Sequence, residues 1–295
     1  MATLATPPHP LWAARNRSQV HLWLPRLSLS RCIRATVVRS TLGQGMRWPA
    51  EWHDNHFPAT PYCSLGWFLR GHADRLPPDG PPERLPQVYF TGPFTRPTRS
   101  RNSAEGHGMI VMLMPDAVQA LTGLSPAGFI NQVLPVEAVL DTEWQAMTQA
   151  VMAAPTDAAR LGVLEDFLDP RWQARRPDGS GPNGRHLQDW AEGLALRAAT
   201  SGIGHSLRAA ERRIKGWAGL PMRELRGMGR AEQAFLRSAS SPEGAVDWAG
   251  LADDAGYADQ SHLCRETRRI TGFSPAELRR RIEQDESFWI YRIWG

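Results

Sequence analysis

Apolar residues recur at helical spacing in the last third of this 295-residue chain. Leu263 and Ile270 lie seven positions apart, so they share one stripe of a predicted helix. Asp259 offers a side-chain oxygen to cap its start, and Ser261 is the other candidate. Gly272 is the predicted end, because glycine readily adopts the left-handed backbone found after helices.

Two further helices flank this one. Trp248 and Leu251 lie on one apolar face of a shorter helix that is expected to stop at Gly256. Residues 274–282 begin with Ser-Pro and continue the apolar spacing, which predicts a third helix. A helix, a glycine turn and a basic helix are typical of a helix-turn-helix unit.

The basic helix has an earlier counterpart in the chain. Residues 206–221 match residues 256–275 with an offset of 53 positions, and the predicted helix in each stretch ends at a glycine. The offset pairs Arg212 with Arg265, Lys215 with Arg268, and Gly219 with Gly272. Such a repeat indicates one supersecondary unit used twice. The helix before Ser206 is weakly marked, since Ala198-Ala199-Thr200 forms a poor apolar face.

The first part of the chain is patterned differently. Short β-prone runs cover residues 20–24, 33–38, 63–69, 88–90 and 109–114, with Pro, Gly and Asp clusters between them. This alternation predicts an antiparallel sandwich or barrel. Residues 143–168 then show helical spacing that is broken at Pro155, and the following Thr-Asp is expected to cap a second helix.

Turn-forming residues between positions 175 and 184 predict a boundary. We therefore expect an α+β chain with a β-rich N-terminal domain that also carries helices, over residues 1–170. A linker would cover residues 171–186, and an all-α domain with two helix-turn-helix units would cover residues 187–295. The aromatic tail, residues 288–294, is expected to pack on its own domain; docking between the domains and a dimer surface are the alternatives.

Composition narrows the class of protein. Three scattered cysteines fit a reduced, cytoplasmic setting. The longest apolar run, residues 109–114, is too short to span a bilayer, and the first ten residues do not resemble a signal peptide. The net charge of +4 comes from the first hundred residues, because the last third holds 15 basic and 13 acidic groups. Local clusters are therefore better evidence for nucleic-acid binding than the overall charge.

No catalytic arrangement is evident in the sequence. Ser64 lacks the glycines of a nucleophile elbow, and no phosphate-binding glycine loop is present. Glu51, His53, His56 and Cys63 are the only concentrated set of metal-ligating types, but they lack a second pair at metal spacing. We expect that the protein is not an enzyme and that it binds no metal and no cofactor. Whether Cys264, or the segment with His53 and His56, has a sensing role stays open.

The C-terminal motifs resemble the AraC/XylS family of transcription regulators. The resemblance covers roughly residues 187 to 285, and two units occur in the family's order and spacing. Thr267 is a departure, since the family usually has a large aromatic residue there, and the core beside it would be thinner. The resemblance is carried by Gly256, Tyr257, Asp259, Gln260, Ser261, His262, Leu263, Arg265, Arg268, Arg269, Thr271, Gly272, Ser274 and Pro275, and in the first unit by Ser206, Arg208, Arg212, Ile214 and Lys215.

This resemblance implies double-stranded DNA as the partner, with two recognition helices in successive major grooves. Arg212 and Arg265 are expected to contact DNA directly. The first turns of the helices would reach base edges through Arg208, Gln260, Ser261 and His262. Lys215, Arg268 and Arg269 are expected to contact phosphates, which set register but not sequence.

Phrases in the N-terminal domain, at residues 58–71, 91–97 and 165–168, resemble sensor-type domains attached to some AraC/XylS regulators. They imply an effector or oligomerisation domain. We expect the protein to be a DNA-binding transcription regulator. A small-molecule effector, a second copy of the chain and RNA polymerase are further candidate partners, and no membrane association is expected. The alternative is a small-molecule or metal-binding β-barrel protein whose helices bind another protein. The effector, the operator, the direction of regulation and the oligomeric state stay open.

Overall fold

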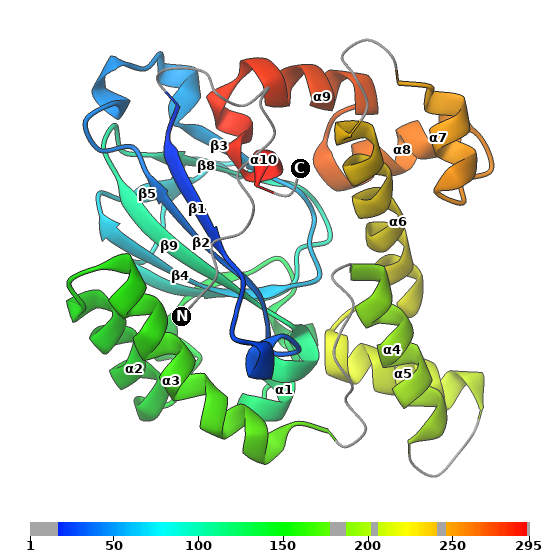
Figure 1. The fold of residues 1–295 in the computed structure, drawn as a ribbon, viewed down its shortest axis with the longest axis horizontal. Helices are drawn as coiled ribbons and strands as arrows, with labels where there is room; N and C mark the ends of the chain where they lie inside the picture. The colour runs from blue at the N-terminus through cyan, green and yellow to red at the C-terminus, as the bar shows by residue number, and fades with distance from the viewer. Residues whose placement is uncertain (1–16, 178–186, 202–205, 241–245, 294–295) are drawn as a thin grey trace.

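The computed structural model describes residues 17–177, 187–201, 206–240 and 246–293. We call the described residues up to 177 the N-terminal part and those from 187 onward the C-terminal part. The N-terminal part holds every strand among the described residues, together with three α-helices, whereas the C-terminal part is helical (Figure 1). The chain is therefore an α+β protein, as its patterning predicts.

Two antiparallel sheets form the N-terminal part. One follows the order β1 (Gln19–Trp23), β2 (Ile33–Ser40), β9 (His107–Leu113), β4 (Cys63–Arg70), β7 (Val88–Thr91) and β10 (Val133–Pro135). The other follows the order β3 (Asp54–Phe57), β8 (Thr98–Asn102), β5 (Ala73–Arg75) and β6 (Glu83–Arg84). All five β-prone runs of the sequence are confirmed as strands.

The two faces of the six-stranded sheet have different neighbours. Val38 on β2 is paired with Met109 on β9, and both belong to a large core that includes residues of the helices covering this face. The next pair, Val37 with Ile110, lies on the opposite face and lines a cavity. Neighbouring residues of a strand point to opposite faces of the sheet, so one face packs against the core and the other lines the cavity.

Three α-helices belong to the N-terminal part: α1 (Pro115–Thr122), α2 (Thr142–Ala153) and α3 (Asp157–Arg175). Thr156 caps α3 by accepting a hydrogen bond from the Ala159 amide, which confirms the predicted cap. The indole nitrogen of Trp67, on β4, donates to the carbonyl of Thr148 at 3.3 Å and so ties the sheet to α2. α3 runs through Pro170 to Arg175, so the predicted linker begins inside a helix.

The C-terminal part is built around the long helix α6. Its helices are α4 (Leu187–Thr200), α5 (Leu207–Ala218), α6 (Met222–Ala239), α7 (Trp248–Asp254), α8 (Gln260–Thr271), α9 (Pro275–Gln284) and α10 (Trp289–Arg292), with the short 3₁₀ helix η7 (Glu286–Phe288) before the last. Two glycines let neighbouring helices approach α6. A methyl group on Gly229 would lie 3.3 Å from the Cα of Gln188 on α4, and one on Gly227 would lie 2.5 Å from a carboxylate oxygen of Glu266 on α8.

The two parts share a hydrophobic core and several polar contacts. Asp116, on α1, accepts hydrogen bonds from the Trp190 indole and from Arg197, both at 3.0 Å, and these two residues lie on α4. Glu232, on α6, pairs with Arg34 on β2 at 3.3 Å. The α6 helix is therefore held directly against the sheet.

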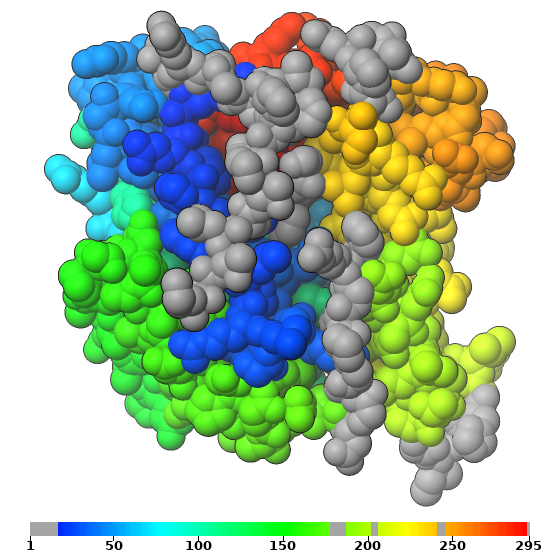
Figure 2. All heavy atoms as spheres, viewed as in Figure 1, coloured from blue at the N-terminus to red at the C-terminus, as the bar shows by residue number. Residues whose placement is uncertain are grey.

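The aromatic tail corrects one expectation. The sequence favoured packing on its own domain, but Trp289 donates from its indole nitrogen to Asn55 on β3 at 2.8 Å. The buried cluster around it joins Val37 of β2 with Leu278 of α9. Figure 2 shows the helices at the end of the chain, α9 and α10, in red, between the N-terminal strands, in blue, and α6, in yellow. The tail docks between the two parts because it offers apolar surface to both.

Candidate nucleic-acid interface and adjoining cavity

The first candidate recognition helix, α5, has well-formed ends. Ser206 caps it by accepting from the Ala209 amide at 3.2 Å, and Gly219 ends it in the left-handed conformation, at φ 78°. Ile214 and Ala218 are buried on its inner face. The three cationic side chains predicted to meet DNA from this helix are all exposed: Arg208, Arg212 and Lys215.

The second candidate, α8, repeats this arrangement. Asp259 accepts from the His262 amide at 2.6 Å, which confirms the predicted cap, and Gly272 ends the helix at φ 87°. Leu263 and Ile270 are buried, as their shared stripe predicts. Four of the six predicted DNA contacts on this helix are exposed: Gln260, Ser261, Arg265 and Arg268.

His262 and Arg269 are placed differently. The His262 ring stands edge-on to Tyr257 at 5.2 Å and is half-buried. Arg269 pairs with Glu224 on α6 at 2.7 Å and with Glu266 at 2.8 Å, and 35% of its side chain is exposed. The hydrogen bonds that Arg269 donates to Glu266 raise the pKa of Arg269 above its usual value. Arg269 therefore ties α8 to α6, a role that the sequence did not indicate. Its phosphate contact stays a prediction.

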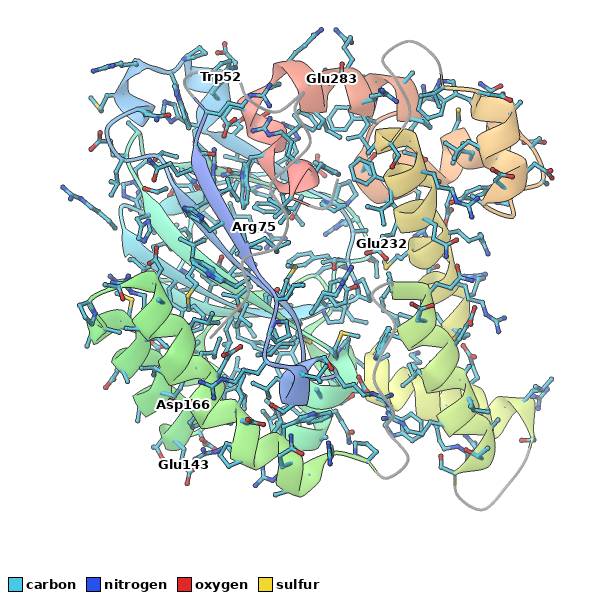
Figure 3. The ribbon with its side chains drawn as sticks, in the orientation of Figure 1. Trp52, Arg75, Glu143, Asp166, Glu232 and Glu283 are labelled. Atoms are coloured by element: carbon cyan, nitrogen blue, oxygen red, sulfur yellow. The ribbon has the colours of Figure 1, made fainter. Side chains whose placement is uncertain are left out.

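A cavity of about 370 Å³ lies between the sheets and the helices α6, α8 and α9. Its wall combines apolar strand residues with Met228 and Phe235 of α6 and Leu263 of α8. Glu232 also lines it, and Figure 3 shows this residue on the side of α6 that faces the N-terminal part. The cavity thus touches both sheets and one candidate recognition helix.

Arg39 is a buried arginine in the cavity wall. Arg39, on β2, pairs with Glu286 at 3.4 Å, and Arg292 pairs with the same carboxylate, so two guanidinium groups share one buried acid. Burial lowers the pKa of Arg39 to about 10, against the opposing effect of Glu286. Arg39 also lies over the Trp289 ring at 4.8 Å, which adds a cation–π contact. This cluster joins β2 to η7 and α10.

The suggested metal-ligating residues are not brought together. Cys63 is buried on β4, whereas the His56 ring stacks on Phe288 at 4.5 Å in the contact between the two parts. Within the ranges that the structure describes, no group of three or more His, Cys, Asp or Glu side chains could hold a metal ion.

None of the described helices combines the length and the apolar character needed to cross a bilayer.

Comparison with known proteins gives remote structural neighbours only. ToxT from Vibrio cholerae is 10% identical, with a TM-score of 0.37, over 88% of this chain and 97% of that chain. ToxT with a bound unsaturated fatty acid is 11% identical, with a TM-score of 0.35, over 76% and 93%. CuxR, described as an AraC-like transcriptional activator, is 12% identical, with a TM-score of 0.25, over 97% and 83%. No family model and no curated protein matches the chain.

Proposed function

We propose that this protein is a sequence-specific, DNA-binding transcription regulator of the kind that the AraC/XylS resemblance implies. One observation carries the proposal. Two helices with the same end structure present cations at equivalent positions, Arg212 with Arg265 and Lys215 with Arg268, while their opposite faces are buried. A helix that packs with one face and presents arginines on the other suits a major groove.

Within each helix we propose a division of roles. Arg208 and Arg212 on α5, and Gln260, Ser261 and Arg265 on α8, would reach base edges, and His262 would do so from its half-buried place. Arginine can bind guanine with two hydrogen bonds, and glutamine can bind adenine in the same way. Lys215, Arg268 and Arg269 would contact phosphates and fix the position of the protein on the duplex.

We further propose that residues 1–170 form the regulatory domain, joined by residues 171–186 to a DNA-binding domain over residues 187–295. The cavity supports binding of a small-molecule effector, because its volume lies in the range of ligand sites and its wall includes α6 and α8. A homodimer and a contact with RNA polymerase belong to the same proposal, as do a cytoplasmic location and the absence of an enzymatic activity.

The test is titration of the intact protein with genomic duplex fragments at two salt concentrations. Affinity should fall steeply as salt rises, because neutralised phosphates release their counterions. Arg212→Ala and Arg265→Ala should each bind more weakly than the parent, and the double variant should bind far more weakly. Arg47→Ala, at an exposed position of the N-terminal part, is the matched control for loss of one charge and should bind as the parent does.

Binding that is absent, or that does not depend on salt, would overturn the proposal. It would favour the alternative, a β-barrel protein that binds a small molecule or a metal and uses its helices to bind another protein.

A further inference from the structure

The inner face of α8 has a small side chain where a large one would fit. Thr267 lies between Leu263 and Ile270 on the buried stripe, is 9% exposed, and lines the cavity together with both. The equivalent position on α5, with the same offset of 53, is Ile214, which is 4% exposed. At this position the first unit therefore has the larger side chain of isoleucine, and the second unit has the smaller side chain of threonine.

Small side chains of α6 line the same cavity as Thr267. On α6, Ala231 and Ala234 line the cavity with the smallest apolar side chain, and Phe235 and Leu278 add larger apolar walls from α6 and α9. We call the part of the cavity that Thr267 and these residues line the α8 hollow. Apolar cavities of about 150 Å³ can bind benzene, so the cavity as a whole, at about 370 Å³, has room for a ring-sized group.

A second observation points to a ligand. Tyr291 is 5% exposed and lines the same cavity, and no group among the described residues makes a hydrogen bond with its buried hydroxyl. Its ring centroid lies 6.1 Å from that of Phe235, which lines the same cavity from α6. Burial raises the pKa of this phenol, so the hydroxyl stays protonated and can donate. A buried donor without an acceptor is costly, and a bound acceptor would remove that cost.

We propose that the α8 hollow binds a small molecule with a ring-sized apolar body and one hydrogen-bond acceptor. The apolar body packs against Thr267 in place of the missing large side chain, and the acceptor receives the hydrogen bond of Tyr291. Binding then completes the core behind α8 and holds this helix more firmly against α6. This regulatory step rests on the proposed DNA-binding function, whereas the binding site does not.

The binding site is tested with three probes and the intact protein. Toluene offers the apolar body, acetophenone adds an acceptor, and acetate offers an acceptor without the body. Ligand-observed NMR should show binding of the first two and none of acetate. Acetophenone should bind about five-fold more tightly than toluene, as one net hydrogen bond implies.

Four variants separate the two contacts. Thr267→Phe fills the hollow and should weaken the binding of both aromatic probes at least ten-fold. Thr267→Leu should weaken this binding to an intermediate degree, and it still tests the site if the Phe variant does not fold. Thr267→Val keeps the shape of the parent side chain and should bind toluene as the parent does. Tyr291→Phe should retain toluene binding and lose the advantage of acetophenone. Undiminished probe binding to Thr267→Phe and Thr267→Leu, or an acetophenone advantage that survives Tyr291→Phe, overturns the proposal.

The regulatory step has a separate readout. The intact protein should bind its duplex more tightly with saturating acetophenone than without it, and Thr267→Phe should bind at the tighter level without a probe. Probe binding that leaves duplex affinity unchanged overturns the regulatory step but not the site. Failure of the protein to bind any duplex overturns the proposed function, while the probe titrations still decide the site.

Discussion

Arg265 and Arg269 lie one helical turn apart on α8, yet their surroundings differ. Arg265 is exposed, whereas Arg269 is held by Glu224 and Glu266. Capping at Asp259 and the stop at Gly272 could be predicted because both signals are local in the sequence. The Arg269–Glu224 pair could not, because its members lie 45 positions apart and meet only when α8 packs on α6.

The exposed arginine leads to a residue-scale prediction. Arg265→Ala should cost about 1–3 kcal/mol of duplex binding and relax the preference at one base position, because an arginine that reads a base edge discriminates among bases. Lys215→Ala should weaken all duplexes alike and reduce the salt slope by about one. Selection of bound sites from random duplexes checks both variants. A uniform loss with Arg265→Ala and unchanged preferences would contradict the base-reading role.

At the scale of elements, the strands show what patterning can find. The five runs rich in Val, Ile, Leu and aromatic residues are strands, but β3, β5, β6, β8 and β10 were not predicted. β3 reads Asp-Asn-His-Phe and β8 reads Thr-Arg-Ser-Arg-Asn, so neither has apolar alternation. Their pairing depends on each other: Asp54 of β3 binds Arg99 and Arg101 of β8. The sequence predicted the six-stranded sheet far better than the smaller one.

Glycines in α3 and α6 have different amounts of space around them, so alanine substitutions should have different effects. Gly162→Ala, in α3, should raise the free energy of unfolding by about 0.5–1 kcal/mol, because alanine favours helix and nothing lies within 4 Å of the added methyl. Gly229→Ala, in α6, should lose this gain, since its methyl would lie 3.3–3.4 Å from three atoms of Gln188. Urea denaturation of both variants checks this. An equal gain at both positions would show that α4 does not pack closely on α6.

At the scale of the whole molecule, the two helix-turn-helix units are similar but not identical, and they belong to one chain. The isolated fragment 187–295 should therefore bind an asymmetric site with a footprint longer than one helical turn, since successive major grooves lie about 34–36 Å apart. It should also melt below the intact protein, because it loses Asn55 as the partner of Trp289. Footprinting and thermal denaturation check these outcomes. A footprint that is insensitive to variants in α5 would show that only α8 contacts DNA.

The contact between the two parts also predicts a dependence on pH. His56, on β3, stacks on Phe288 and lies edge-on to Phe273 at 5.6 Å. Burial, followed by the charge of Arg99, lowers its pKa from 6.5 to about 4, although Asp285 and Asp54 oppose the shift and Arg281 adds to it. The docked protein therefore favours the neutral ring, and the unfolded chain binds the proton more readily.

Stability should consequently fall as pH is lowered from about 6.5 towards about 4, since the unfolded state takes up a proton that the native state excludes over this range. His56→Phe keeps an aromatic ring between the two phenylalanines and removes the titrating group. Its melting temperature should decline less than that of the parent between pH 7 and pH 5. If both proteins lost stability equally over this interval, the acid sensitivity would belong to groups other than His56.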